Sequence, residues 1–197
     1  MKTRNFKSYV QRGFTLLELV VVVAVVGVLI SIFAPNLVSS KEGANAQLLL
    51  RVPSQMAQNW MLINQACGTS SAVSGSPLTN TGKTVSDILF GGSANVAAAY
   101  TNCYAQSKVL PLTEVAQPSG SAGIYNVGGY TVTLTGGGTS ALSIAYATVP
   151  DSLALLMAQK YNPTLATLAA SDNTSAVLQY STATTGTRTV TVLKAIN

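Results

Sequence analysis

The chain of 197 residues contains no histidine. This absence excludes Ser-His and Cys-His catalytic arrangements and an imidazole general base, and two cysteines alone make no zinc cluster. The six acidic residues are isolated in sequence and form no recognisable catalytic pair. Composition leaves a Ser-Lys hydrolase open, but no S-x-x-K motif is present. We therefore expect that the protein is not an enzyme and that it holds no metal ion or cofactor.

The sequence also lacks a phosphate-binding loop and has few charges. Gly82-Lys83-Thr84 resembles the end of such a loop, but the glycine expected five positions earlier is Pro77. Charged residues make up only 9% of the chain, which is low for a cytosolic domain, and small or polar uncharged residues replace them. Such a composition suits a surface that is repeated many times in an assembly.

What the sequence does contain is one long apolar stretch, which begins after Arg12 and reaches Pro35. Between Leu19 and Ile30 no side chain is polar. A helix over residues 14–36 would cover roughly 30 Å, the thickness of the hydrocarbon core of a bilayer. The sequence therefore predicts a hydrophobic membrane-spanning helix over residues 14–36. Pro35 cannot donate a backbone hydrogen bond, and we expect it to kink this helix.

One carboxylate, Glu18, lies near the start of the apolar stretch. A charge inside a membrane-spanning segment costs roughly 3 kcal/mol or more, so it normally has a partner or a function. The alternative without function is that Glu18 reaches the headgroups and favours the helix N-terminus. A cleaved secretory signal is a further alternative for the whole stretch, but the bulky Ile32 stands where such a signal needs a small residue.

The run G-F-T-L-L-E at residues 13–18 resembles the processing site of type IV prepilins and pseudopilins. The resemblance implies that residues 1–13 are a leader and that a prepilin peptidase cuts between Gly13 and Phe14. The same enzyme would then methylate the new N-terminus at Phe14. Glu18 would be the fifth residue of the mature chain and would pair with the N-terminus of a neighbouring subunit during assembly.

The resemblance implies a structural subunit of a type IV pilus, used for adhesion, motility or DNA uptake. Such a subunit lies in the bacterial inner membrane before assembly and then in an extracellular helical filament of its own copies. Its partners are the prepilin peptidase and the inner-membrane assembly machinery. The alternatives are a minor pilin or type II secretion pseudopilin, and a pilus-mounted adhesin or DNA-binding module. The 13-residue leader favours a type IVb-like pilin.

The distribution of charge gives little support to nucleic-acid binding. Four basic residues precede the predicted cut, and the remaining chain has seven basic and six acidic residues, a net charge of +1. The basic residues of the leader keep that end cytoplasmic by the positive-inside rule. A basic patch would require five scattered residues to converge in space, namely Lys83, Lys108, Lys160, Arg188 and Lys194.

The two cysteines bracket most of a connecting region at residues 67–123, which is rich in Gly, Ser, Thr and Asn. Because the implied leader places the domain outside the cytoplasm, we predict a Cys67–Cys103 disulfide, with two free thiols as the alternative. This disulfide would lie directly after the long helix, whereas in many type IV pilins the disulfide lies near the C-terminus. Residues 86–90 are predicted to form a helical turn.

Residues 37–66 are predicted to form an amphipathic helix. Apolar residues recur there at spacings of three and four, and we expect this stripe to pack on a sheet rather than on a cofactor: Leu49, Val52, Met56, Trp60 and Ile63. Pro53 falls inside the stripe, so the element is predicted to be kinked or split into two helices in series.

Residues 124–197 are predicted to form a β-sheet with an inserted helix. Alternating apolar and polar residues indicate four strands, at 130–135, 141–149, 176–180 and 187–196, and the spacing over 151–161 indicates a helix that Asp151 would cap. The predicted fold class is α+β: a long N-terminal helix, half membrane-spanning and half amphipathic, packed on a mostly antiparallel, pilin-like sheet.

Overall fold

The computed structural model of the chain describes residues 15–135 and 141–196, with the backbone alone at 32–40 and 135. It divides into two compact units, Met1–Lys41 and Glu42–Asn197. Helix α1, Leu16–Cys67, has residues in both. The predicted leader, residues 1–13, and Phe14 lie outside the described residues.

The first unit contributes the apolar half of α1. Its valines are modest helix formers in water, yet the helix is continuous from Leu16 onward. Among the described residues, no helix combines the length and the mean hydropathy of a membrane span. The predicted membrane-spanning segment at 14–36 is therefore not shown by the structure.

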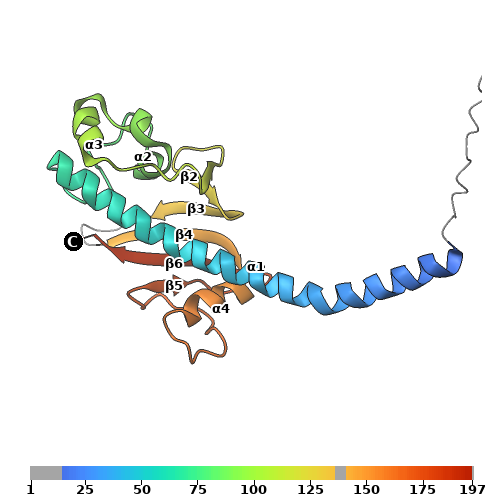
Figure 1. The fold of residues 1–197 in the computed structure, drawn as a ribbon. Helices are drawn as coiled ribbons and strands as arrows, with labels where there is room; N and C mark the ends of the chain where they lie inside the picture. Colours follow the sequence, from blue (N-terminus) through green and yellow to red (C-terminus); the bar gives the residue numbers. More distant parts are fainter. Residues whose placement is uncertain (1–14, 136–140, 197) are drawn as a thin grey trace, which may run out of the picture. The chain divides into compact units, whose positions relative to one another are not determined.

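The second unit has α1 residues 42–67 packed on a sheet of six strands (Figure 1). All five residues of the predicted apolar stripe are fully buried in the core, which confirms that the stripe packs against protein. Trp60 lies at 0% exposure, and its indole N–H donates to the carbonyl of Ser71 at 2.8 Å, so the only polar atom of this large side chain is satisfied.

The prediction that Pro53 splits this helix is wrong, because α1 continues through it to Cys67. Pro53 is buried, and Val52 and Met56 beside it are both at 0% exposure. An interior proline costs about 3 kcal/mol, while burying each large apolar side chain returns roughly 1.5–3 kcal/mol. Packing of the stripe therefore outweighs the one backbone hydrogen bond that Pro53 cannot make.

The sheet is antiparallel throughout, in the order β1-β2-β3-β4-β6-β5. Its strands are Ala116–Pro118 (β1), Ile124–Val127 (β2), Tyr130–Thr135 (β3), Ala141–Pro150 (β4), Leu178–Tyr180 (β5) and Thr187–Ala195 (β6). Helix α4, Asp151–Gln159, follows β4 directly. The α+β fold with an antiparallel sheet and an inserted helix is thus as predicted, and β1 and β2 are additions to the four predicted strands.

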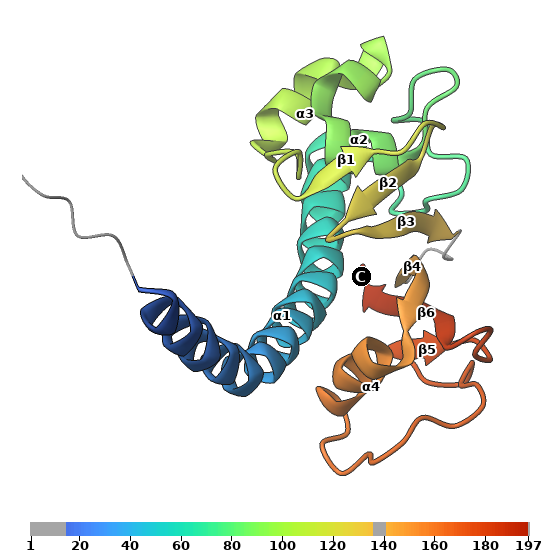
Figure 2. The ribbon, with the colours of Figure 1, turned by 90° about the vertical axis from the view of Figure 1, so that its right-hand side faces the viewer.

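Residues between α1 and β1 are more ordered than the predicted connecting region suggests (Figure 2). They form α2 (Val85–Gly91), the 3-10 helices Gly92–Asn95 and Ala98–Tyr100, and α3 (Thr101–Ser107). The predicted helical turn at 86–90 lies within α2. The predicted disulfide is present: Cys67, the last residue of α1, is bonded to Cys103 in α3.

We expect the double substitution Cys67→Ser, Cys103→Ser to lower the free energy of unfolding by about 3 to 4 kcal/mol, because the bond closes a long loop in the unfolded chain. Urea unfolding of the full chain in detergent, followed by Trp60 fluorescence, measures the loss. Wild-type protein treated with reductant should lose the same amount. Unchanged stability in both samples would contradict a structural role for the bond.

Candidate functional site

The described part of the predicted processing and assembly site begins with a capping box at the start of α1. The carboxylate of Glu18 accepts hydrogen bonds from the backbone N–H and the hydroxyl of Thr15, both at 3.0 Å. In return the Thr15 hydroxyl accepts from the N–H of Glu18 at 3.2 Å. Thr15 is thus the N-cap, and it fixes the carboxylate of Glu18 beside the positive end of the helix.

Sequence reasoning singled out Glu18 and missed Thr15. The signal was available, since a Thr followed three residues later by a Glu before an apolar run is the pattern of a capping box. Gly13 and Phe14, the predicted cleavage pair, lie outside the described residues. Pro35 lies within α1, and its side chain is among those not described.

The apolar half of α1 leaves its large side chains uncovered. From Leu16 to Ile30 each large apolar residue is exposed, ranging from 46% at Val26 to 81% at Leu16. A cation is absent from this stretch, and Glu18 carries its only charge. A helix that is apolar all round is normally buried, either in lipid or among other helices. Among the described residues, this segment therefore presents an apolar surface that is left exposed.

A family described as the prokaryotic N-terminal methylation motif matches residues 9–34. The match includes Gly13, Phe14 and Glu18 together with most of the exposed apolar helix. It confirms the predicted resemblance to the prepilin and pseudopilin class for this part of the chain.

Curated relatives match a short part of the chain. The chain is 56% identical over 40 residues to the type II secretion system core protein G of Pectobacterium carotovorum subsp. carotovorum, which covers 20% of this chain and 26% of that protein. It is 57% identical over 37 residues to the protein of the same name from Escherichia coli (strain K12), covering 19% and 26%. The chain thus spans about a quarter of the length of these relatives. No solved structure matches it.

A second cluster of interest surrounds Asp87, a buried carboxylate in α2 with 5% exposure. It accepts from the backbone N–H of Thr84 at 2.7 Å, the backbone N–H of Gly123 at 3.0 Å and the hydroxyl of Tyr125 at 2.9 Å. Burial opposes ionisation, but these hydrogen bonds outweigh it and lower the pKa of Asp87. Burial and the contact with Asp87 raise the pKa of Tyr125 to about 12.

This cluster holds the fold together and offers little chemistry. Among the described residues, the Asp87 carboxylate accepts hydrogen bonds from Thr84, the N-cap of α2, and from Gly123 and Tyr125 at the start of β2, so it joins the helix to the sheet. Within the described residues no three acidic, Cys or His side chains gather as metal ligands.

The five scattered basic residues do not all converge. Arg188 is buried, and its Nε donates to Asp151 Oδ1 at 2.7 Å, so it is part of the interior. Asp151 makes no side-chain cap for α4, contrary to prediction, because Arg188 engages it instead. Lys194 lies 3.5 Å from the hydroxyl of Tyr161, which follows Lys160 in the chain.

We expect Asp87→Asn to lower the free energy of unfolding by about 2 kcal/mol at pH 7, since the new amide faces donors with an NH₂ group. The carboxylate stabilises the fold above its unfolded pKa of about 4, and this contribution is lost as the pH falls through the lower folded value. The gap between wild type and variant should therefore close below about pH 4.

Denaturant unfolding of the full chain from pH 7 to pH 3 measures this gap. Glu114→Gln is the matched control, because Glu114 is exposed and has no ion pair among the described residues. A gap that is independent of pH would contradict stabilisation by the ionised carboxylate.

Proposed function

We propose that this chain is a pilin-like filament subunit of the bacterial envelope, cut between Gly13 and Phe14 and methylated on Phe14. The observation that supports it best is the methylation motif at 9–34, which includes the uncovered apolar helix from Leu16 to Ile30. Before assembly residues 14–36 lie in the inner membrane. On assembly the same apolar surface leaves the lipid and packs against the helices of other copies.

Glu18 selects the register in which the helices of neighbouring subunits pack. A carboxylate and an N-terminal amine that meet in an apolar filament core neutralise each other where the dielectric constant is low. A subunit added out of register would leave one of the two charges buried and unpaired. The hydrogen bonds from Thr15 support this role, because they hold the carboxylate at the helix start, close in sequence to the new terminus at Phe14.

We propose a structural role without catalysis, and between the two filament classes we favour a type II secretion pseudopilus. The names of the matched relatives support this choice. A type IV pilus subunit is the second candidate, because the matched residues lie in the segment that the two classes have in common. The remainder of the chain, including the whole β-sheet, lies outside the methylation motif.

Intact-mass spectrometry of protein sheared from cells tests the processing. We expect a chain that starts at Phe14 and is heavier by one methyl group, with a further gain of two hydrogens on reduction of the Cys67–Cys103 bond. Abundance in the sheared fraction would favour the pilus, and retention in the envelope would favour the pseudopilus. A chain that starts at Met1, or that is cut near Ala34, would overturn the proposal.

The assembly role of Glu18 is tested by two substitutions that separate charge from capping. Glu18→Gln keeps an acceptor for the Thr15 N–H, and Gln is accepted at this position of a capping box, but the charge is lost. Glu18→Ala loses both. We expect both variants to reduce the assembled fraction at least roughly tenfold, as the unpaired amine would then be buried.

Cross-linking of filaments in intact cells, with processing monitored in parallel, measures the assembled fraction. Thr15→Ser is the control, since it keeps the hydroxyl that completes the capping box. If Glu18→Gln assembled like wild type while Glu18→Ala did not, Glu18 would act only as a helix cap.

A further inference from the structure

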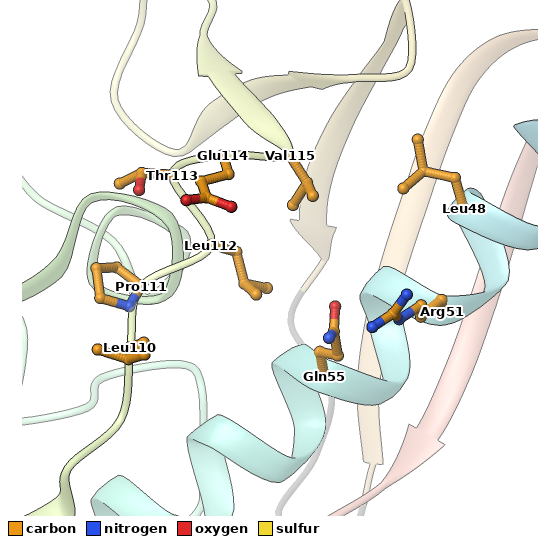
Figure 3. A pocket seen from close by; sticks show the side chains of 9 residues that line it. All are labelled: Leu48, Arg51, Gln55, Leu110, Pro111, Leu112, Thr113, Glu114 and Val115. Atoms are coloured by element: carbon orange, nitrogen blue, oxygen red, sulfur yellow. The ribbon is translucent and has the colours of Figure 1, made fainter.

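A groove runs along α1 at the β1 edge of the sheet (Figure 3). Its volume is about 560 Å³, and nine residues line it, namely Leu48, Arg51, Gln55 and the segment 110–115. The segment 110–115 is fixed at two points. The side-chain amide of Asn59 donates to the carbonyl of Leu110 at 3.2 Å, and the backbone N–H of Leu112 donates to the carbonyl of Leu89 at 3.0 Å. The groove is therefore a built feature of the second unit.

The two walls of the groove carry opposite charges that do not meet. Arg51 extends from α1 on one side and Glu114 lies in the segment on the other, while the side chain of Leu112 points between them (Figure 3). Both charged residues are exposed, and within the described residues neither forms an ion pair. Leu110 at the end of the groove is 81% exposed. An occupant should be apolar in the middle, with an anion on one side and a cation on the other.

Side chains of these three kinds, an aromatic ring, cations and an anion, lie near the opposite edge of the sheet. There Tyr161, 42% exposed, lies beside Lys194, whose ammonium is 5.9 Å from the centre of the ring. Lys160 is exposed and unpaired within the described residues. Asp172 lines the same small hollow as Tyr161 and is fixed to β5 by two backbone hydrogen bonds with Tyr180. Its Oδ1 accepts from Thr174 and Ser175, and no bond to its Oδ2 occurs in the described part.

We infer that the groove receives the Tyr161 patch, defined as Lys160, Tyr161, Asp172 and Lys194, of a second copy of this chain. The aromatic ring enters between the walls, Lys160 faces Glu114 and Asp172 faces Arg51. Charge complementarity carries the choice of partner, because the chain itself supplies both halves of the contact.

The position of the two surfaces determines what they build. The groove lies at the β1 edge and the patch lies next to β5, the strand at the other edge of the sheet. A contact between two different surfaces is heterologous, and it extends into an open chain unless the rotation closes a ring. The inference rests on the proposed function, since it names an interface between the domains of neighbouring filament subunits.

The test is a charge exchange in full-length protein in cells. Glu114→Lys alone and Lys160→Glu alone place like charges against each other, and each should lower the cross-linked assembled fraction at least roughly tenfold. The two substitutions together restore opposite charges and should recover most of the assembly. Lys83→Glu is the matched control, because it makes the same charge change at an exposed site outside the groove and the patch, and it should neither impair assembly nor rescue Glu114→Lys.

A cysteine pair provides a second readout. Thr113→Cys in the groove wall and Asn162→Cys beside Tyr161, in one chain, should form a ladder of disulfide-linked oligomers under oxidation. Wild-type-like assembly of both single charge variants, or no recovery in the double variant, would overturn the interface while the filament proposal stands. Dimers formed by Thr113→Cys alone would show grooves paired with grooves and would also overturn it. Failure of the wild type to assemble would instead contradict the proposed function.

Discussion

The fold depends on the burial of one face of α1 against the antiparallel sheet. The helix supplies five fully buried side chains, and the central strands supply Leu142, Ile144, Tyr146, Val190 and Val192, all at 0% exposure. At roughly 1.5–3 kcal/mol for each large side chain, this contact is large enough to carry Pro53 inside a continuous helix. The other elements attach to it: α2 through the Asp87 cluster, and α3 through the disulfide.

Sequence periodicity predicted the parts of the fold in which one strong pattern decides the structure. The stripe on α1, the long strands β3, β4 and β6 and the helix α4 each have enough residues for their period to be read. The short strands β1 and β2 do not, and the tight Gly128–Gly129 turn that brings β2 against β3 is clear only once both strands are known. Pairings between distant residues, such as Arg188 with Asp151, leave no local signal.

The residues of the candidate sites also differ in whether the sequence alone identifies them. The methylation motif is local, so the sequence identified Glu18 and the cleavage pair. The groove joins α1 to a segment more than fifty residues further along the chain, and the Tyr161 patch joins residues between 160 and 194, so both become visible only in the folded domain. The two halves of α1 also differ in what they require. Residues 42–67 pack in the core of the second unit, whereas the stretch from Leu16 to Ile30 is left exposed among the described residues.

The Cys67–Cys103 bond has a mechanical consequence. Cys67 is the last residue of α1, so a tensile load that reaches Cys67 along this helix passes through the disulfide to Cys103 in α3. The residues between the two cysteines then lie off the path of the load and are not extended while the bond is intact.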